Sequence, residues 1–267
     1  MSNLSATASK PTALVTGGAG EGIGHGITEA LCAAGWAVLI TDIDAARANI
    51  FTKRLKSEGA LVASITLDVT EQDAPERSVQ AALEHFGRLD GLVNNVGVGL
   101  TKLAGDVSDE EFLRLFHVDF MASFRFVRAA LPALRKAKGS VVNIGSIHAV
   151  GSAKNYALYS AVKSSLEAFT RGLAVDYGKD GLRANIVHPG WVDSPQNDAL
   201  LAKIFPDPKA WIGDFTELRQ CIPRAIQARE VGELVAFLLG DKSQMITAQS
   251  ICIDGGTTAM LWNNEKT

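Results

Sequence analysis

Short apolar runs alternate with amphipathic segments along almost the whole chain. The runs are four to seven residues long and apolar at most positions, which is typical of strands covered on both faces. We expect seven strands, at Ala13–Thr16, Ala37–Thr41, Leu61–Leu67, Gly91–Asn94, Ser140–Ile144, Arg183–Val187 and Ser250–Ile253.

Between the runs, apolar residues recur at helical spacing. Helices are expected at Asp44–Ser57, Glu71–Phe86, Asp109–Arg135, Tyr156–Tyr177 and Glu230–Leu239, besides one after the first strand. Ser108 marks a helix start, because its hydroxyl can cap the acidic first turn that follows. This alternation predicts an α/β, doubly wound Rossmann fold, in which a seven-stranded, mostly parallel sheet has helices on both faces.

The alternation stops at residues 194–223, which contain four prolines together with Phe205, Trp211 and Phe215. A long insertion at the carboxyl edge of the sheet favours a substrate lid, and a surface excursion packed only for stability is the alternative. We otherwise expect one domain over residues 1–267, with a flexible leader at residues 1–10.

Composition excludes several function classes. The net charge of −3 gives no basic surface for nucleic acid, and no run of about 18 uncharged apolar residues exists to span a bilayer. Cys32, Cys221 and Cys252 are far apart, which indicates reduced thiols, and the histidines lack metal-ligand spacing. We expect a cytoplasmic protein with a small-molecule substrate, no catalytic metal, and no nucleic-acid or membrane partner.

The first strand leads into the stretch T-G-G-A-G-E-G-I-G-H-G. A glycine-rich turn before a helix lets backbone N–H groups approach a pyrophosphate. G-x-G-x-x-G is absent, but G-x-x-x-G-x-G fits from Gly18 through Gly22 and Gly24. We therefore expect Gly18 to be the first functional glycine, with Glu21 on the adenosine ribose side and Ile23 over the pyrophosphate.

Asp42 ends the second expected strand, where an acidic side chain accepts hydrogen bonds from the adenosine ribose hydroxyls. A carboxylate there repels a 2′-phosphate, and neither the glycine stretch nor Ile43 supplies a basic side chain to offset it. Glu21 adds a second negative charge. NAD is therefore expected rather than NADP, and a helix cap is the alternative role of Asp42.

Tyr159 and Lys163 are four positions apart in an expected helix, so their side chains lie one turn apart on one face. An ammonium close to a phenol stabilises the phenolate, which lets the tyrosine exchange a proton near neutral pH. Ser146 follows an expected strand, and its hydroxyl can bond a substrate oxygen beside the tyrosine.

The order and spacing of these features resemble the short-chain dehydrogenase/reductase family over residues 10–257. Each motif alone is weak, but the set in this order is specific. The motifs are the glycine stretch, Asp42, L-D-V at Leu67–Val69, N-N-V-G at Asn94–Gly97, Ser146, Tyr159-x-x-x-Lys163, H-P-G at His188–Gly190 and I-D-G-G at Ile253–Gly256.

The resemblance implies further cofactor contacts. Asp68 and Val69 would hold the adenine, Lys163 would hold the nicotinamide ribose hydroxyls, and backbone groups after the H-P-G turn would hold the carboxamide. The residues with contacts implied in this way are Asp68, Val69, Asn95, Tyr159, Lys163, Val192 and Ser194.

The resemblance also implies a reaction: Tyr159 exchanges a proton with a secondary alcohol or ketone that Ser146 orients. We expect an NAD-dependent oxidoreductase of this kind, with a sugar, polyol or hydroxylated ring as substrate. A 3-oxoacyl thioester reductase is the alternative enzyme, and a catalytically silent dinucleotide-binding sensor is the alternative of another class. Family members are mostly homotetramers or homodimers, so we expect one of these.

Four positions depart from the family pattern or stand beside it. Asp119 replaces an asparagine that supports a proton relay, and it either acts on Lys163 as a further catalytic residue or is tolerated with little effect. Gly145 replaces a serine, with no expected consequence. His148 either bonds a second substrate hydroxyl or is a surface loop residue, and His188 is expected to be structural.

Overall fold

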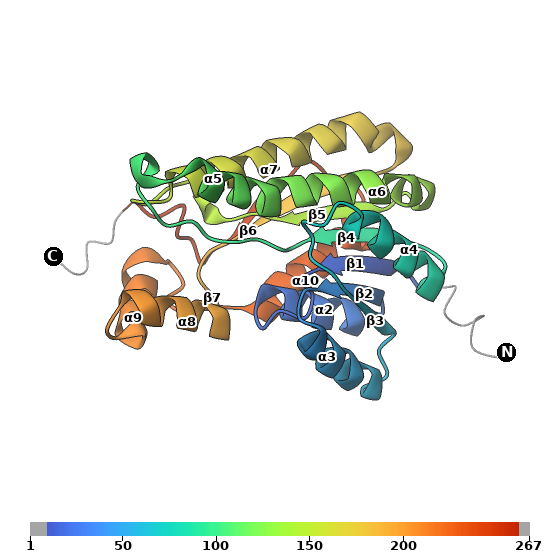
Figure 1. Ribbon diagram of the computed structural model, residues 1–267, viewed down its shortest axis with the longest axis horizontal. Helices are drawn as coiled ribbons and strands as arrows, with labels where there is room; N and C mark the ends of the chain where they lie inside the picture. Colours follow the sequence, from blue (N-terminus) through green and yellow to red (C-terminus); the bar gives the residue numbers. More distant parts are fainter. Residues whose placement is uncertain (1–9, 262–267) are drawn as a thin grey trace.

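The computed structural model describes residues 10–261, so residues 1–9 of the expected leader lie outside the described residues. Seven strands form one parallel sheet in the order β3-β2-β1-β4-β5-β6-β9 (Figure 1). Their bounds are β1 (Thr12–Thr16), β2 (Ala37–Asp42), β3 (Val62–Thr66), β4 (Gly91–Asn94), β5 (Ser140–Ile144), β6 (Arg183–Pro189) and β9 (Ser250–Ile253). The predicted doubly wound fold is confirmed, with every ladder of this sheet parallel.

Helices cover both faces of the sheet (Figure 1). One face carries α2 (Ile23–Ala33), α3 (Ala45–Ser57) and α10 (Ala228–Leu239). The other carries α4 (Ala74–Phe86), α6 (Ala122–Ala137) and α7 (Ala157–Tyr177). Short 3₁₀ turns complete the connections: η1 (Ala104–Asp106), η3 (Ile147–Ala149), η4 (Gly178–Asp180) and η5 (Asp241–Ser243).

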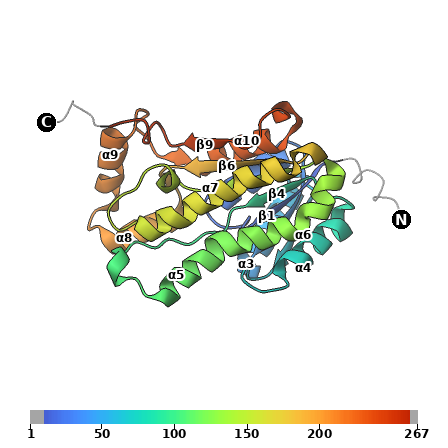
Figure 2. The same cartoon turned by 90° about the horizontal axis from the view of Figure 1, so that it is seen from above.

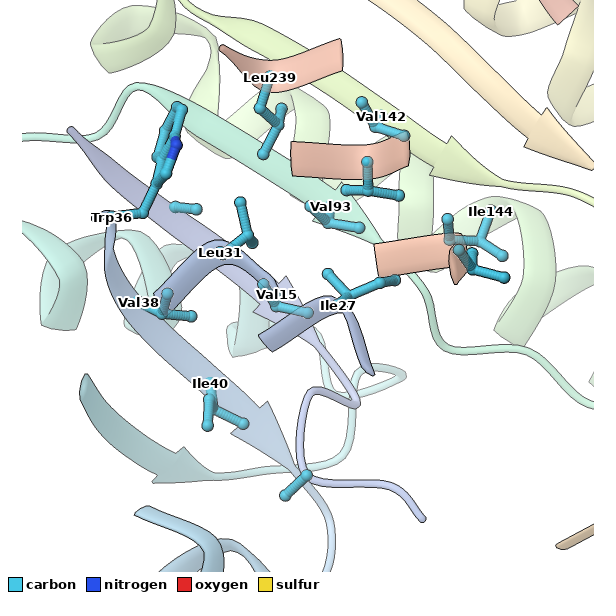
Figure 3. Packing of buried hydrophobic residues seen from close by; sticks show 14 of the residues in the cluster. Val15, Ile27, Leu31, Trp36, Val38, Ile40, Val93, Val142, Ile144 and Leu239 are labelled. Carbon is cyan, nitrogen blue, oxygen red and sulfur yellow. The ribbon is translucent and has the colours of Figure 1, made fainter. Parts of the chain in front are cut away.

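Alternate residues of the central strands supply two separate cores. On β1, Ala13 and Val15 pack toward α2 and α10, while Leu14 packs toward α4 and α6. Figure 3 shows the first core, where Val15 lies near Ile27 and Leu31 of α2. Because both faces of each central strand are buried, these strands are apolar throughout, which is why the hydrophobic pattern predicted them well.

The expected helix Asp109–Arg135 is one helical run with an irregular turn. It consists of α5 (Asp109–Phe116), a π-helical turn η2 (His117–Met121) and α6. Its start is confirmed: the Ser108 hydroxyl accepts from Glu111 N–H, and the Glu111 carboxylate accepts from Ser108 N–H. The π turn adds a residue to the helix, and this bulge carries Asp119 into the core.

Residues 194–223 form two helices, α8 (Pro195–Ile204) and α9 (Pro208–Arg219). Just before them, β7 (Val192–Asp193) pairs in parallel with β8 (Ile226–Gln227), which follows them. This short ladder ties the two ends of the segment together. Both views place α8 and α9 beyond the carboxyl edge of the sheet (Figures 1 and 2). Among residues 10–261, no helix is long and apolar enough to cross a bilayer.

Candidate active site

The sheet reverses its strand order between β1 and β4, and the residues that follow these strands lie side by side. Asn95 links them: its backbone N–H donates to Thr16 Oγ1 at 2.9 Å, and its side-chain Nδ2 donates to the Thr16 carbonyl at 3.0 Å. A crevice at such a switch point is the usual ligand site of an open α/β sheet.

The glycine-rich turn after β1 is packed so tightly that a Cβ at Gly17, Gly18 or Gly24 would lie within 3.0 Å of a neighbouring atom. Gly17 has a φ of +62°, which favours glycine. A Cβ on Gly24 would lie 2.1 Å from the Gly17 carbonyl oxygen, so the start of α2 rests directly on the turn. Gly18 is held on β2 instead, because its N–H donates to the Thr41 carbonyl at 3.2 Å. Gly17 therefore makes the close approach to α2, while a cofactor role for Gly18 stays a prediction.

The first turn of α2 presents backbone groups that fit a pyrophosphate. Gly22 is the N-cap, no side chain in the described part of the chain caps it, and the first turn, Ile23-Gly24-His25, holds no carboxylate. An N-terminus of this kind attracts anions, which agrees with the phosphate role predicted for this turn. Glu21 is exposed beside it, and Gly22 lies against the Ser194 side chain.

Asp42 is buried at the end of β2 and has three donors. Its carboxylate accepts from Ala19 N–H at 3.2 Å, from Asp44 N–H at 3.0 Å and from Arg47 Nη2 at 2.7 Å. The glycine turn and the expected ribose acceptor are therefore fixed to each other. The sequence prediction missed Arg47, because it considered only the glycine stretch and Ile43. The available signal was a basic residue in the first turn of the helix that follows Asp42.

Two of the positions that the resemblance assigns to adenine follow β3. The Asp68 carboxylate accepts from Thr70 N–H at 2.8 Å and from Thr70 Oγ1 at 2.7 Å, which closes a small turn. Val69 is buried next to it. Both of the bonds from Thr70 go to one carboxylate oxygen of Asp68, Oδ1, and adenine recognition stays a prediction.

Lys163 and Asp119 form a buried ion pair. The Lys163 Nζ lies 2.9 Å from Asp119 Oδ2, and the two residues are 4% and 1% exposed. Asp119 Oδ1 accepts from Val98 N–H at 2.8 Å, and Lys163 also donates to the Ile144 carbonyl at 3.4 Å. Burial is the largest single influence on the pKa of Lys163 and acts to lower it, but the charge of Asp119, the neighbouring Tyr159 and the hydrogen bond to Asp119 together outweigh it, so the pKa is raised above 10.5 and the ammonium persists.

Tyr159 lies one turn before Lys163 on α7. The ammonium is 5.6 Å from the centre of the Tyr159 ring, on the same helix face, as the four-residue spacing predicts. The structure therefore brings Asp119, Tyr159 and Lys163 together. The ammonium stabilises negative charge on the phenol whenever the tyrosine gives up its proton.

Ser146 follows β5 and is held from two sides. Its backbone N–H donates to His188 Nδ1 at 3.1 Å, and its Oγ accepts from His148 N–H at 3.2 Å. Because the hydroxyl oxygen already accepts a hydrogen bond, the hydroxyl proton remains available for a substrate oxygen. Ser146 is buried, and its turn η3 packs against α7.

His148 belongs to an aromatic group around Tyr159. Its ring stacks on Tyr156, with centroids 4.1 Å apart at an interplanar angle of 7°, and meets Tyr159 edge-on at 5.8 Å. Burial lowers the pKa of His148 below 6.5, so the imidazole is neutral at pH 7. The side chain is half-buried beside the phenol rather than free on a surface loop.

Gly145 is consequential, contrary to the expectation from sequence. A Cβ at Gly145 would lie 2.3 Å from Nδ1 of His188, whose fully buried ring fills that space. No side chain fits at this position while His188 is present.

The base of the segment 194–223 lies next to the site. Val192 is buried, and its carbonyl accepts from Asn197 Nδ2 at 2.7 Å. Ser194 caps α8 through its hydroxyl, which accepts from Asn197 N–H at 3.2 Å. Farther out, Trp211 is the centre of an aromatic cluster, with ring centroids 5.1 Å from Trp191, 5.1 Å from Phe205 and 5.2 Å from Phe215.

Comparison with known proteins identifies the family. A family model described as enoyl-(acyl carrier protein) reductase matches residues 18–258. The chain belongs to the short-chain dehydrogenase/reductase family, whose members are oxidoreductases that bind a nicotinamide dinucleotide.

Relatives cover nearly the whole chain. It is 33% identical over 265 residues to trans-4-hydroxycyclohexanecarboxylate dehydrogenase of Sinomonas cyclohexanicum, covering 97% of each chain. It is 32% identical over 249 residues to cyclopentanol dehydrogenase of Comamonas testosteroni, covering 92% of this chain and 96% of the relative. A solved variant of actinorhodin polyketide ketoreductase with NADPH superposes with a TM-score of 0.89 at 28% identity, covering 97% of this chain and 100% of that one.

Proposed function

We propose that this chain is an NAD-dependent oxidoreductase that interconverts a cyclic secondary alcohol and its ketone. The observation that carries the proposal is the buried Lys163 ammonium beside Tyr159. The Ser146 hydroxyl, whose proton is free to bond a substrate oxygen, accepts from the N–H of His148, and the His148 ring contacts Tyr159. Such a set matches the transfer of one proton to or from an alcohol oxygen.

The steps assigned to the chain are those of positioning and proton transfer. When bound, NAD supplies the hydride acceptor. In the oxidation direction, the Ser146 hydroxyl donates a hydrogen bond to the alcohol oxygen and holds that oxygen beside Tyr159. Tyr159 then takes the proton of that oxygen, and Lys163 stabilises the phenolate from which the transfer starts. In ketone reduction, Tyr159 returns the proton to the oxygen.

A hydroxylated ring is the substrate class we favour. The rings of His148 and Tyr156 are stacked on each other and both meet Tyr159 edge-on, and this aromatic group beside the phenol suits the apolar body of a ring. Two of the similar proteins are named for alcohols on a cyclohexane or cyclopentane ring. The neutral His148 imidazole supplies a polar group for a second substituent, and residues 194–223 are proposed to cover the substrate as a lid.

The test is a panel of cyclic secondary alcohols with NAD, followed at the nicotinamide absorbance. Tyr159→Phe removes the proton carrier and is expected to lower kcat by about 10²- to 10⁴-fold while NADH binding stays within about twofold. Wild-type protein that binds NADH but oxidises no member of the panel would instead support a sensor. Turnover confined to 3-oxoacyl thioesters would support the reductase alternative.

NAD is proposed because the Asp42 carboxylate stands at the ribose position, with its charge partly offset by Arg47. Asp42→Asn removes the negative charge and leaves the Arg47 guanidinium free to meet a 2′-phosphate. We expect the ratio of kcat/KM for NADP to that for NAD to rise about 10- to 100-fold, because a hydrogen bond to a charged group is worth about 1.5–3 kcal/mol. Adding Arg47→Ala should abolish the gain, and a wild-type preference for NADP contradicts the proposed cofactor.

Two further proposals concern the protein in the cell. Cys32, Cys221 and Cys252 are free thiols, which supports a reducing compartment such as the cytoplasm. A homodimer or homotetramer is proposed, with the outer faces of α5, α6 and α7 as the contact surface.

A further inference from the structure

His188 lies fully buried directly behind the loop that carries Ser146. Its Nδ1 accepts the Ser146 backbone N–H at 3.1 Å, so the proton of the neutral ring is on Nε2. That nitrogen faces α7, where the Glu167 carboxylate lies 3.3 Å away. Glu167 is one turn beyond Lys163 and is itself paired with Arg171. A chain of polar contacts therefore runs from α7 through the core to the backbone of Ser146.

The contact between His188 and the Ser146 backbone depends on the glycine at position 145. The His188 ring fits only because position 145 is glycine, and the ring fills the space that a Cβ would need. Ser146 thus has its N–H fixed from behind by His188 and its Oγ fixed from the front by His148 N–H. With both bonds made, the backbone and the oxygen of Ser146 are held in place, and the hydroxyl proton stays available to a substrate oxygen.

We propose that His188 and Glu167 are positioning residues, which set the place of the Ser146 hydroxyl through the Ser146 backbone. The inference rests on the proposed function, in which Ser146 bonds the substrate oxygen. The Glu167 carboxylate favours the His188 tautomer with its proton on Nε2. The unprotonated Nδ1 of His188 then accepts the backbone N–H of Ser146 and holds it in place. A proton added to Nδ1 turns the acceptor into a donor, so the Ser146 N–H loses its partner and the loop must shift.

The groups around His188 set the pH at which Nδ1 takes up that proton. Burial is the largest influence and lowers its pKa below 6.5, and the Lys163 ammonium lowers it further, while Glu167 raises it. On the other side, Cys252 of β9 is the register partner of His188 and carries a neutral thiol, because burial raises its pKa. The ring is therefore neutral at pH 7. We expect kcat to fall as the pH drops below 6.5, and we call this fall the acid limb of the pH profile.

Three variants test the positioning role in the full-length protein. His188→Leu leaves the Ser146 N–H buried without an acceptor, and kcat is expected to fall about 10- to 100-fold with NADH binding unchanged. His188→Asn places an amide oxygen near the former Nδ1, so it should recover most of the loss and abolish the acid limb. Glu167→Gln removes the charge that raises the His188 pKa, so the limb should move to lower pH. His85→Leu, at an exposed histidine of α4, is the matched control.

Two readouts separate this inference from the proposed function. Thermal melting and NADH binding report whether each variant folds. The ¹⁵N NMR signals of the His188 ring, identified by their loss in His188→Asn, are expected to show a bare Nδ1 and a protonated Nε2 without any substrate. The opposite tautomer, or an active wild type whose kcat and acid limb survive His188→Leu, overturns the positioning role. A wild type that oxidises no alcohol overturns the proposed function, while the tautomer still decides the inference.

Discussion

The carboxylate of Asp119 and the ammonium of Lys163 are both removed from water, 2.9 Å apart. Taking two charges out of water is costly, and their attraction repays the cost only when the remaining polar atoms also find partners. Val98 N–H and the Ile144 carbonyl supply such partners. The pair holds Lys163 charged and in place beside Tyr159, which is how Asp119 can serve the site without touching substrate.

Replacing Asp119 by asparagine tests this pair. The amide oxygen can still accept from Val98 N–H, but Lys163 loses its counter-charge, and we expect a loss of about 3–5 kcal/mol in the free energy of unfolding. The pKa of Lys163 is raised in the wild type, so its share of stability is present below pH 10.5 and lost above it. In Asp119→Asn burial is opposed by Tyr159 alone, so the pKa of Lys163 falls and the alkaline loss of activity should move to lower pH.

Urea unfolding and a pH–rate profile measure the two effects. Asp109→Asn, at an exposed acid in the first turn of α5, is the control. An alkaline limb that is the same in both variants would contradict the role of Asp119.

Sequence alone proposed Ser146, Tyr159 and Lys163 as site residues, because each stands at a fixed place relative to a strand end or a helix turn. It did not find the contact of Arg47 with Asp42, nor that of His188 with Ser146. The second joins residues far apart in the chain, and only the adjacent strands β5 and β6 bring them together. It also judged Gly145 neutral, since the ring that fills its space lies on another strand.

At the scale of elements, the aromatic cluster holds the segment 194–223 together. Trp211 of α9 contacts rings before α8, after α8 and one turn along α9. Both ends of the segment are closed by the β7–β8 ladder. A unit with its own small core and a narrow base can move as a body against the sheet, as a lid does.

Trp211→Ala is expected to loosen this unit without disturbing the cofactor turn. Each aromatic pair is worth about 0.5–1.5 kcal/mol beyond its burial, so we expect KM for the alcohol to rise about tenfold. The Kd for NADH should stay unchanged. Phe237→Ala, at a partly exposed ring on α10, should leave both constants unchanged. An equal effect on NADH binding would argue against a separate substrate lid.

The elements themselves differ in how well the pattern predicted them. Strand ends moved by at most two residues, because strands buried on both faces stand out from polar neighbours. The π turn at His117–Met121 was not predicted, since helical spacing continues through it. The π turn is explained by a tertiary contact, because it brings Asp119 to Lys163. The hydrophobic periodicity of the helix gives no information about that contact.

At the scale of the whole molecule, the helices α5 and α7 keep large apolar side chains in contact with solvent. Leu113 of α5 is 49% exposed and Val175 of α7 is 78% exposed. Along α5 and the π turn, Phe112, Phe116 and Phe120 form a row of stacked rings. A helix pair with such a face is suited to packing against a second copy of the chain.

Val175→Glu should weaken self-association if α7 forms that contact. A buried carboxylate without a partner opposes the interface, so we expect a smaller species in sedimentation experiments at the same protein concentration. Ile50→Glu, at an equally exposed residue of α3, is the matched control and should leave the association state unchanged. The same sedimentation profile for wild type and Val175→Glu would place the contact elsewhere.

The close fit of Gly145 and His188 also restricts the order in which these two positions can change. With the ring in place, even a methyl group at position 145 would meet Nδ1 at 2.3 Å. A substitution at position 145 is therefore accepted only after position 188 has lost its ring, whereas the reverse order has no such barrier. A related protein that has both a histidine at the position of His188 and a side chain at the position of Gly145 must therefore have a different conformation in the loop of Ser146.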